Sequence, residues 1–316
     1  MQTLEQYNKK DIVNTSGVRY ADFKESLTPD YLKAWIDLGL GLIALPAVGA
    51  IIWVVNKMYP SWFIISGIIG AVAVGYLIAY IQLFMHEAAH YNLVKNKKLN
   101  DILTNLFIGI FVGLDVKHYR CIHFNHHRHL GKTIDSESNY FDPLNMLFFL
   151  ESLSGIKGLK VMMRRERTSL STGEKKSTFN VIFLFGIIFN LSVIITLAQY
   201  HQWTLIVVWI VGIGLVFPLF NALRQLLEHR SENASPTIDY TKTPHGEINR
   251  MFGDGFFART FGGAGFNRHL LHHWEPQISY TRLKELENYL LETPLMESLQ
   301  QSKTSYSQIF LKLFNR

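Results

Sequence analysis

The sequence predicts an all-α integral membrane protein with four transmembrane helices, and two long stretches without charge are the main reason. Charged residues make up 18% of the chain, against about 25% in ordinary soluble domains. Between Asp37 and Glu87 the only ionised side chain is Lys57. Between Lys176 and Arg224 there is no Asp, Glu, Lys or Arg. A soluble protein needs polar side chains on its surface every few residues, so we expect both stretches to face lipid.

Each uncharged stretch is long enough for two bilayer-crossing helices of about 20 residues, separated by a turn. The predicted spans cover residues 36–55, 62–85, 179–198 and 203–220. Aromatic side chains flank both turns, as expected at headgroup depth: Tyr59, Trp62, Tyr200 and Trp203. The alternative is a pair of buried helical hairpins in a soluble fold, which would leave such a protein with little polar surface. We therefore expect two hairpins in the membrane.

The basic residues predict which side of the membrane carries the polar segments. Two hairpins place the start of the chain and residues 86–178 and 221–316 on one side. Lys57 alone, of 31 Lys and Arg residues, lies outside these segments, so the positive-inside rule makes this side cytoplasmic. We expect a single domain over residues 1–316, with 86–178 and 221–316 forming a cytoplasmic helical cap. The net charge of +6 suits anionic lipid better than nucleic acid, because cations and acids are mixed throughout.

Nine of the 13 histidines fall in four tight groups near the predicted membrane exits. Two groups carry histidines at positions i, i+3 and i+4, one pair is spaced i, i+4, and one histidine follows the fourth span. Because residues three and four apart share a helix face, we expect each group to point its imidazoles in one direction. The nine are His86, His90, His123, His126, His127, His229, His269, His272 and His273.

Nine converging imidazoles predict a metal centre, because neutral imidazole is a common metal ligand. One zinc ion takes about four ligands, so nine suit two ions with four or five ligands each. Imidazole binds zinc, copper, iron and nickel, so these side chains leave the choice of metal open. Glu228 is a candidate to hydrogen-bond a ligating imidazole or to cap the fourth span. Cys121 lies among the histidines, and we expect a packed small residue there rather than a ligand.

Other segments have simpler interpretations. His118 and His129 lie off the helical face of their group, and His201 lies in the turn across the membrane. Residues 102–114 are apolar but too short to span, which predicts an interfacial or re-entrant segment. Residues 157–176 are rich in Lys and Arg and predict a basic surface helix and loop.

Three histidine boxes, HEAAH at 86–90, HFNHH at 123–127 and HLLHH at 269–273, resemble those of the integral-membrane fatty acid desaturase and hydroxylase superfamily. The resemblance extends to HHRHLG after the second box and NRHLLHHWEPQ around the third, and covers about residues 35–290. It implies a fatty acyl or other lipid substrate, O2 as co-substrate, and two iron ions held by the nine histidines.

The resemblance has further implications for partners and for the surroundings of the ligands. Electrons are expected from a separate protein of the ferredoxin, rubredoxin or cytochrome b5 type. An acidic surface on that donor would dock on the basic cap of this protein. In some relatives an asparagine takes part in the metal site at the position of Gln225. The glutamine here puts an amide or water ligand at that position in doubt. Glu87 and Asn267, which lie in or beside the boxes, are additional candidates for contacts to the ligands.

Several alternative functions are consistent with part of the pattern. A hydroxylase or ketolase of a lipophilic substrate would use the same boxes as a desaturase. HEAAH also matches zinc metalloproteases, with His86 and His90 as ligands and Glu87 as base, but that leaves seven grouped histidines unexplained. A metal transporter would need polar ligands within its spans, and these spans have almost none.

Overall fold

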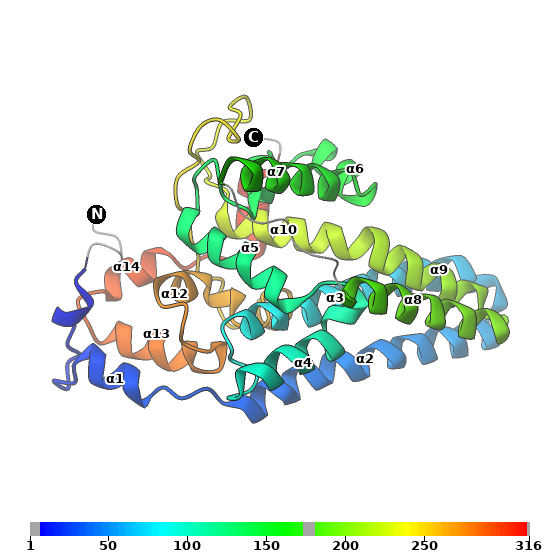
Figure 1. Cartoon of the computed structure of the whole chain (residues 1–316), viewed down its shortest axis with the longest axis horizontal. Coiled ribbons are helices and arrows are strands. Elements are labelled where there is room, and N and C mark those ends of the chain that lie inside the picture. Colours follow the sequence, from blue (N-terminus) through cyan, green and yellow to red (C-terminus); the bar gives the residue numbers. More distant parts are fainter. Residues whose placement is uncertain (1–6, 173–180, 315–316) are drawn as a thin grey trace.

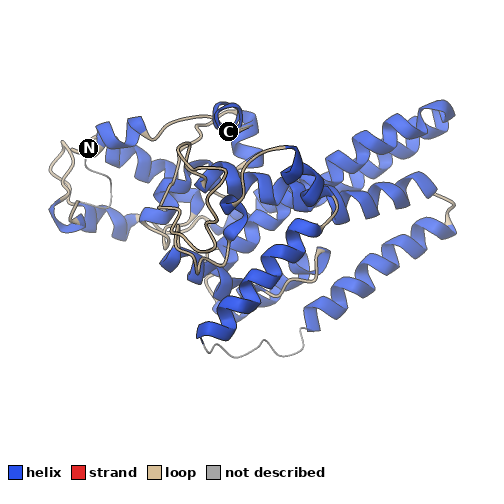
Figure 2. Cartoon of the chain, turned by 90° about the horizontal axis from the view of Figure 1, so that it is seen from above, coloured by secondary structure: helices blue, strands red, loops and turns tan. Residues whose placement is uncertain are grey.

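The computed structural model describes residues 7–172 and 181–314, and its regular elements in these ranges are helices. Among the described residues, four helices are long and apolar enough to cross a membrane. They are Tyr31–Met58, Pro60–Ala89, Val181–Gln199 and Trp203–His229. The predicted all-helical class with four candidate membrane spans is therefore confirmed. Figure 1 shows these helices extending together away from the rest of the chain, and the view from above in Figure 2 agrees.

Two of the spans continue beyond their predicted ends and carry histidines with them. Helix α3 (Phe63–Ala89) includes His86 and ends just before His90. The fourth span consists of α9 (Trp203–Val211), the π-helical turn η6 (Gly212–Val216) and α10 (Phe217–His229). The charged residues near its end do not stop the helix, because Arg224 and Glu228 pair at 2.7 Å within it.

Helix α3 is at the centre of the bundle, between α2 (Tyr31–Met58) and the fourth span. The α3–η6 contact is very close: a Cβ atom on Gly75 would lie 2.5 Å from Val216 Cβ and 2.8 Å from the Gly212 carbonyl oxygen. Small residues allow membrane helices to approach in this way. Helix α8 (Val181–Gln199) packs against α9 on the outside of the bundle.

The segment predicted as interfacial or re-entrant forms a sharp bend. Helix α4 (Lys97–Phe107) and the short turn η4 (Gly109–Phe111) meet α5 (Val116–His129) at 89°. Gln82 donates a hydrogen bond to the Ile108 carbonyl oxygen and Asn190 donates to that of Phe111. These two side-chain amides donate hydrogen bonds to carbonyl oxygens that have lost their α-helical partners at the bend. Irregular backbone near lipid needs such hydrogen bonds.

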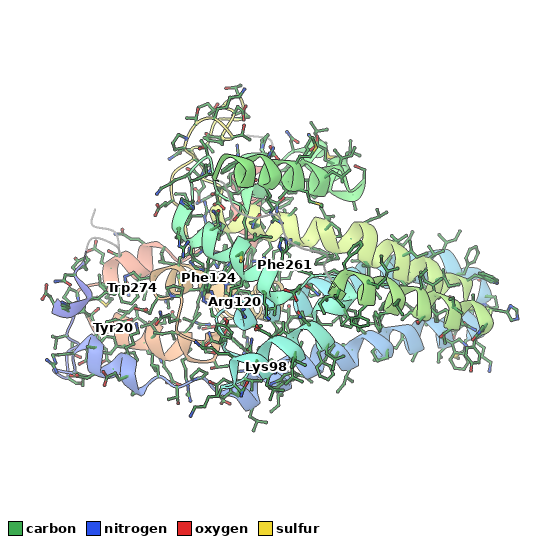
Figure 3. All side chains as sticks on the ribbon, viewed as in Figure 1. Tyr20, Lys98, Arg120, Phe124, Phe261 and Trp274 are labelled. Carbon is green, nitrogen blue, oxygen red and sulfur yellow. The ribbon has the colours of Figure 1, made fainter. Side chains whose placement is uncertain are left out.

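Most of the remaining helices gather at the end of the bundle away from the α8–α9 turn, and α6 (Met146–Leu153) and α7 (Ile156–Thr172) lie alongside α10 (Figure 1). The others are α1 Tyr20–Ser26, α11 Phe256–Phe261, α12 His269–Trp274, α13 Leu283–Leu291, α14 Met296–Gln301 and α15 Tyr306–Leu313. The N-terminal segment holds the end of α12: the Tyr20 ring lies 5.0 Å from Trp274, and Tyr20 and Lys24 both donate to Glu275 (Figure 3).

Two predictions about this polar part are wrong. Cys121 is exposed rather than packed. Helix α7 is not simply a basic surface helix, because Lys157 is buried and donates to Asp142, and Arg165 donates to the Ser136 carbonyl oxygen. These two cations therefore point inward, whereas Lys160 is exposed. The end of the predicted loop, residues 173–180, lies outside the described residues.

Candidate metal centre

The structure brings all nine grouped histidines into two clusters. We call them the five-histidine cluster (His86, His90, His123, His127 and His272) and the four-histidine cluster (His126, His229, His269 and His273). Within each cluster, one possible ligand atom from every residue lies within 4.8 Å of the others. The residues come from α3, α5, α10 and α12, together with His90 at the end of α3.

Each of the two boxes with three histidines is divided between the clusters, which differs from the expected common direction. His123 and His127 belong to the five-histidine cluster, but His126 belongs to the other. In the third box the division is reversed: His269 and His273 join the four-histidine cluster and His272 the five-histidine cluster. The physical reason is helix geometry, since adjacent residues are about 100° apart around the axis at 3.6 residues per turn.

The Nε2 atoms face one another inside each cluster. The Nε2 atom of His123 lies 3.0 Å from that of His90 and 2.9 Å from that of His127. In the other cluster, the Nε2 atom of His269 lies 2.9 Å from that of His229. Two nitrogens bound at about 2.0–2.1 Å to one ion would lie roughly 3 Å apart. The donor set therefore fits two metal ions.

Hydrogen-bond acceptors behind several imidazoles orient them for this purpose. His126 Nδ1 lies 2.9 and 3.0 Å from the two Asp135 oxygens, and His123 Nδ1 lies 3.4 Å from Glu137. His229 Nδ1 lies 2.9 Å from the Ile248 carbonyl oxygen. An acceptor at Nδ1 places the proton there and leaves the Nε2 lone pair free for a metal.

Sequence reasoning missed Asp135 and Glu137. Both follow the second box closely in the segment TIDSES, so acidic residues just after a histidine box were the available signal. They were not found because 131–137 is irregular backbone, for which helical spacing predicts no direction.

The two predicted carboxylates lie on different sides of the ligands. Glu87 Oε1 is 3.5 Å from His86 Nδ1, and Glu87 also accepts from the Tyr280 amide at 3.1 Å. It therefore lies behind its histidine, unlike a protease base, which would face the metal. Glu228 Oε2 lies 3.8 Å from His269 Nε2, on the metal-facing side.

The two predicted amide residues also have distinct contacts. Gln225 donates to Glu137 at 2.6 Å and accepts from Asn139 at 2.6 Å, so it holds the carboxylate behind His123. Asn267 was expected near a ligand, but its side chain donates to the Gly253 carbonyl oxygen at 2.7 Å. The contact instead ties the segment just before α12 to the segment just before α11.

Three further histidines were predicted to lie away from the ligands. His118, His129 and His201 belong to neither cluster. His129 Nδ1 lies 3.1 Å from the Asn125 carbonyl oxygen, and His201 lies between α8 and α9.

Burial controls the protonation of the imidazoles outside the spans. It lowers the pKa of His127, His272 and His273 well below the ordinary 6.5, so these side chains are neutral at pH 7. Burial also disfavours the charged form of His126, but the neighbouring Asp135 and Glu137 outweigh it and raise its pKa to about 9.

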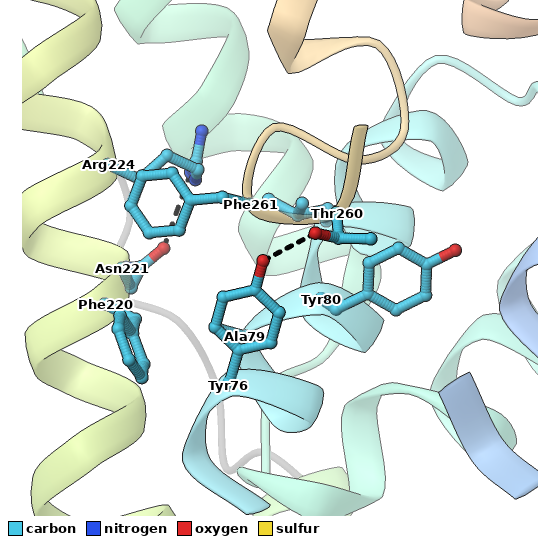
Figure 4. Close-up of a pocket in the computed structure, with 9 residues that line it drawn as sticks. Tyr76, Ala79, Tyr80, Phe220, Asn221, Arg224, Thr260 and Phe261 are labelled. Atoms are coloured by element: carbon cyan, nitrogen blue, oxygen red, sulfur yellow. Dashed lines mark hydrogen bonds between the residues drawn. The ribbon is translucent and has the colours of Figure 1, made fainter. Parts of the chain in front are cut away.

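A small cavity lies beside the clusters, between α3, α10 and α11 (Figure 4). Its walls include Tyr76, Phe220 and Phe261, and the Tyr76 hydroxyl lies 2.6 Å from Thr260 Oγ1. Arg224 also lines it and stacks on the Phe266 ring at 3.9 Å. The Phe266 ring in turn lies 4.4 Å from the His86 ring, so one side-chain layer separates the cavity from the histidines.

Four candidate membrane helices and two histidine clusters that could hold metal ions are the combination expected of a metal-dependent membrane protein. A comparison with protein families makes this specific: the family model described as fatty acid desaturase matches residues 60–305, which include all nine histidines. The match covers most of the chain, so the chain belongs to the fatty acid desaturase family. The resemblance predicted from the boxes is confirmed, and the protein is a desaturase-like oxidoreductase.

Proposed function

We propose that the protein is an O2-dependent desaturase of a fatty acyl lipid that works with two iron ions. The observation that carries this proposal is the pair of clusters, in which nine mostly buried imidazoles turn their Nε2 atoms toward two centres. The five-histidine cluster would hold one ion and the four-histidine cluster the other. Iron bound there would supply the oxidising power, with O2, to remove hydrogen from an unactivated C–H bond.

The protein's own residues would orient the ligands and keep water out. Asp135, Glu137 and the Ile248 carbonyl fix three imidazoles through Nδ1. Arg224 neutralises Glu228 beside the four-histidine cluster, so this carboxylate does not stand alone in a buried site.

The cavity supports a substrate that reaches the site from lipid. Tyr76 and Phe220 lie on candidate membrane helices, and Phe261 completes an aromatic wall. Such an aromatic wall suits an apolar substrate such as an acyl chain, and the cavity, which has room for about one water molecule, would have to widen to admit it.

The proposed sidedness follows the charge distribution. We place the metal clusters and both termini on the cytoplasmic side, because nearly all Lys and Arg residues lie in the segments that join or follow the spans. A soluble donor of the ferredoxin, rubredoxin or cytochrome b5 type would deliver electrons there.

The deciding experiment is expression in a host, followed by mass spectrometry of total fatty acids and lipids. The desaturase proposal predicts a product that has lost two hydrogen atoms, and His272→Ala as control gives none. A product that has gained one oxygen atom would instead establish a hydroxylase, and a further loss of two hydrogens from it a ketolase.

Metal analysis of the purified protein provides an independent check. We expect close to two irons per chain, one for each cluster. One zinc and no iron would refute the proposal and revive the zinc metalloprotease alternative.

A further inference from the structure

Up to Arg165, the last α7 side chain that the structure describes, helices α6 and α7 turn apolar side chains outward while Lys157 is buried, the reverse of a water-facing surface helix. On α6 the exposed residues follow a helical face: Met146, Leu147, Leu150 and Leu153. On α7 they do the same: Ile156, Leu159, Met162 and Met163. Five of these eight side chains have relative exposures of 59–65%. Helices on a protein surface in water carry their apolar stripe toward the core.

The two lysines in the described part of the pair both have acidic partners within the fold. Lys157 is 1% exposed and lies between Asp142 and the Phe148 ring. Lys160 pairs with Glu151 at 2.5 Å and so links the two helices. The charges of the described side chains are thus largely satisfied within the fold, and the outer face is left to the apolar residues.

The position of α6 along the fourth span indicates what covers this face. Helix α6 packs against α10 and also against η6, which ends at Val216. Val216 precedes Arg224, the first charge after the uncharged stretch, by a helical rise of about 12 Å. The α6 contact therefore lies on the part of the span assigned to lipid.

We propose that α6 and α7 lie in the membrane, with their outward apolar face embedded in the leaflet on the side of the metal clusters. Interfacial helices bury such a face about 5–10 Å deep at the boundary of headgroups and acyl chains. Exposed apolar patches of this kind mark interaction sites rather than water-facing surface. This inference does not depend on which reaction the protein catalyses.

Spin-label accessibility in vesicles tests the embedding. In a Cys121→Ser background, which removes the exposed native thiol, single cysteines replace Leu150 or Met162. Leu191 on α8 is the lipid-facing control, and Lys242, whose side chain is 82% exposed, is the water-facing control. The full-length labelled variants are placed in vesicles of phosphatidylethanolamine and phosphatidylglycerol.

The readout is the ratio of collision rates with O2, which partitions into lipid, and with a neutral nickel chelate, which stays in water. We expect the ratio at both α6–α7 positions to shift away from the water control toward the lipid control. A ratio equal to the water control would overturn the proposal. Low access to both probes with spin coupling between labels would also overturn it, because a second copy would then cover the face. Unchanged metal content shows that each variant is folded.

Discussion

The five-histidine and four-histidine clusters share the second and third boxes, but the first box completes one, His229 completes the other, and their surroundings differ. The five-histidine cluster has one more imidazole, and Glu137 supports His123 from 3.4 Å. The four-histidine cluster has a closer support, Asp135 at 2.9 Å from His126, and Glu228 lies on its metal-facing side. The comparison teaches that a metal pair here would be asymmetric: one ion in a neutral imidazole set, the other beside a carboxylate.

Removal of one imidazole from each cluster has the largest expected effect. His126→Ala and His272→Ala should each lower activity more than about 100-fold, beyond the range expected for a changed hydrogen-bond partner. The metal content should separate the clusters, because His272→Ala still leaves four imidazoles and His126→Ala leaves three. Activity assays and iron analysis of the membrane-inserted variants measure both effects. Full activity in either variant contradicts the ligand assignment.

Removal of the hydrogen-bond acceptor at Nδ1 of an imidazole should lower activity less than removal of the imidazole itself. It should also show whether Asp135 or Glu137 contributes more. Asp135→Asn should reduce activity or metal affinity about 10- to 100-fold, because a neutral amide oxygen holds the His126 proton at Nδ1 more weakly than a carboxylate. Glu137→Gln is the matched change at the longer contact and should cost less. Metal titration of chelator-treated protein measures both. An equal loss of metal affinity in the two variants, or a larger loss in Glu137→Gln, would contradict the stronger orienting contact that we infer for the four-histidine cluster.

The pH dependence of metal binding should also differ between the clusters. The pKa of His126 is raised to about 9, so its added proton stabilises the chelator-treated fold below pH 6.5, and this contribution is lost as the pH rises through about 9. Metal must displace that proton, so affinity at the four-histidine cluster should rise about tenfold per pH unit in this window. His127 and His272 have lowered pKa values, so the five-histidine cluster should vary little. Calorimetry in buffers of different ionisation enthalpy detects the proton release; its absence would contradict the prediction.

The smallest expected effect on activity comes from a change in the turn between α8 and α9, at the end of the bundle away from the metal clusters. His201→Ala should leave activity and metal content unchanged, because His201 lies in the turn between α8 and α9 and in neither cluster. Parallel assays with the cluster variants measure this. Loss of activity would mean that the far turn contributes to the site.

The membrane spans were predictable from sequence because lipid requires long uninterrupted apolar stretches, but their ends were not. The fourth span continues to His229 since Arg224 and Glu228 neutralise each other inside the helix. A charge pair that a tertiary environment buries is not distinguishable in the sequence from a solvated helix end.

The direction of α7 was unpredictable for a related reason. Its Lys and Arg residues suggested a face in water, but Lys157 and Arg165 have partners in the segment 136–142. Which side of a helix is outward depends on what packs against it, and these partners come from another part of the chain.

The sequence by itself determined the uncharged stretches, the family and the nine histidines, because each is a matter of local composition or spacing. Only the tertiary structure decided the membership of the clusters. His126 and His127 are neighbours in the chain but belong to different clusters, since side chains about 100° apart on one helix meet different partners. Those partners are supplied by α3, α10 and α12, and their arrangement follows from packing rather than from any single motif.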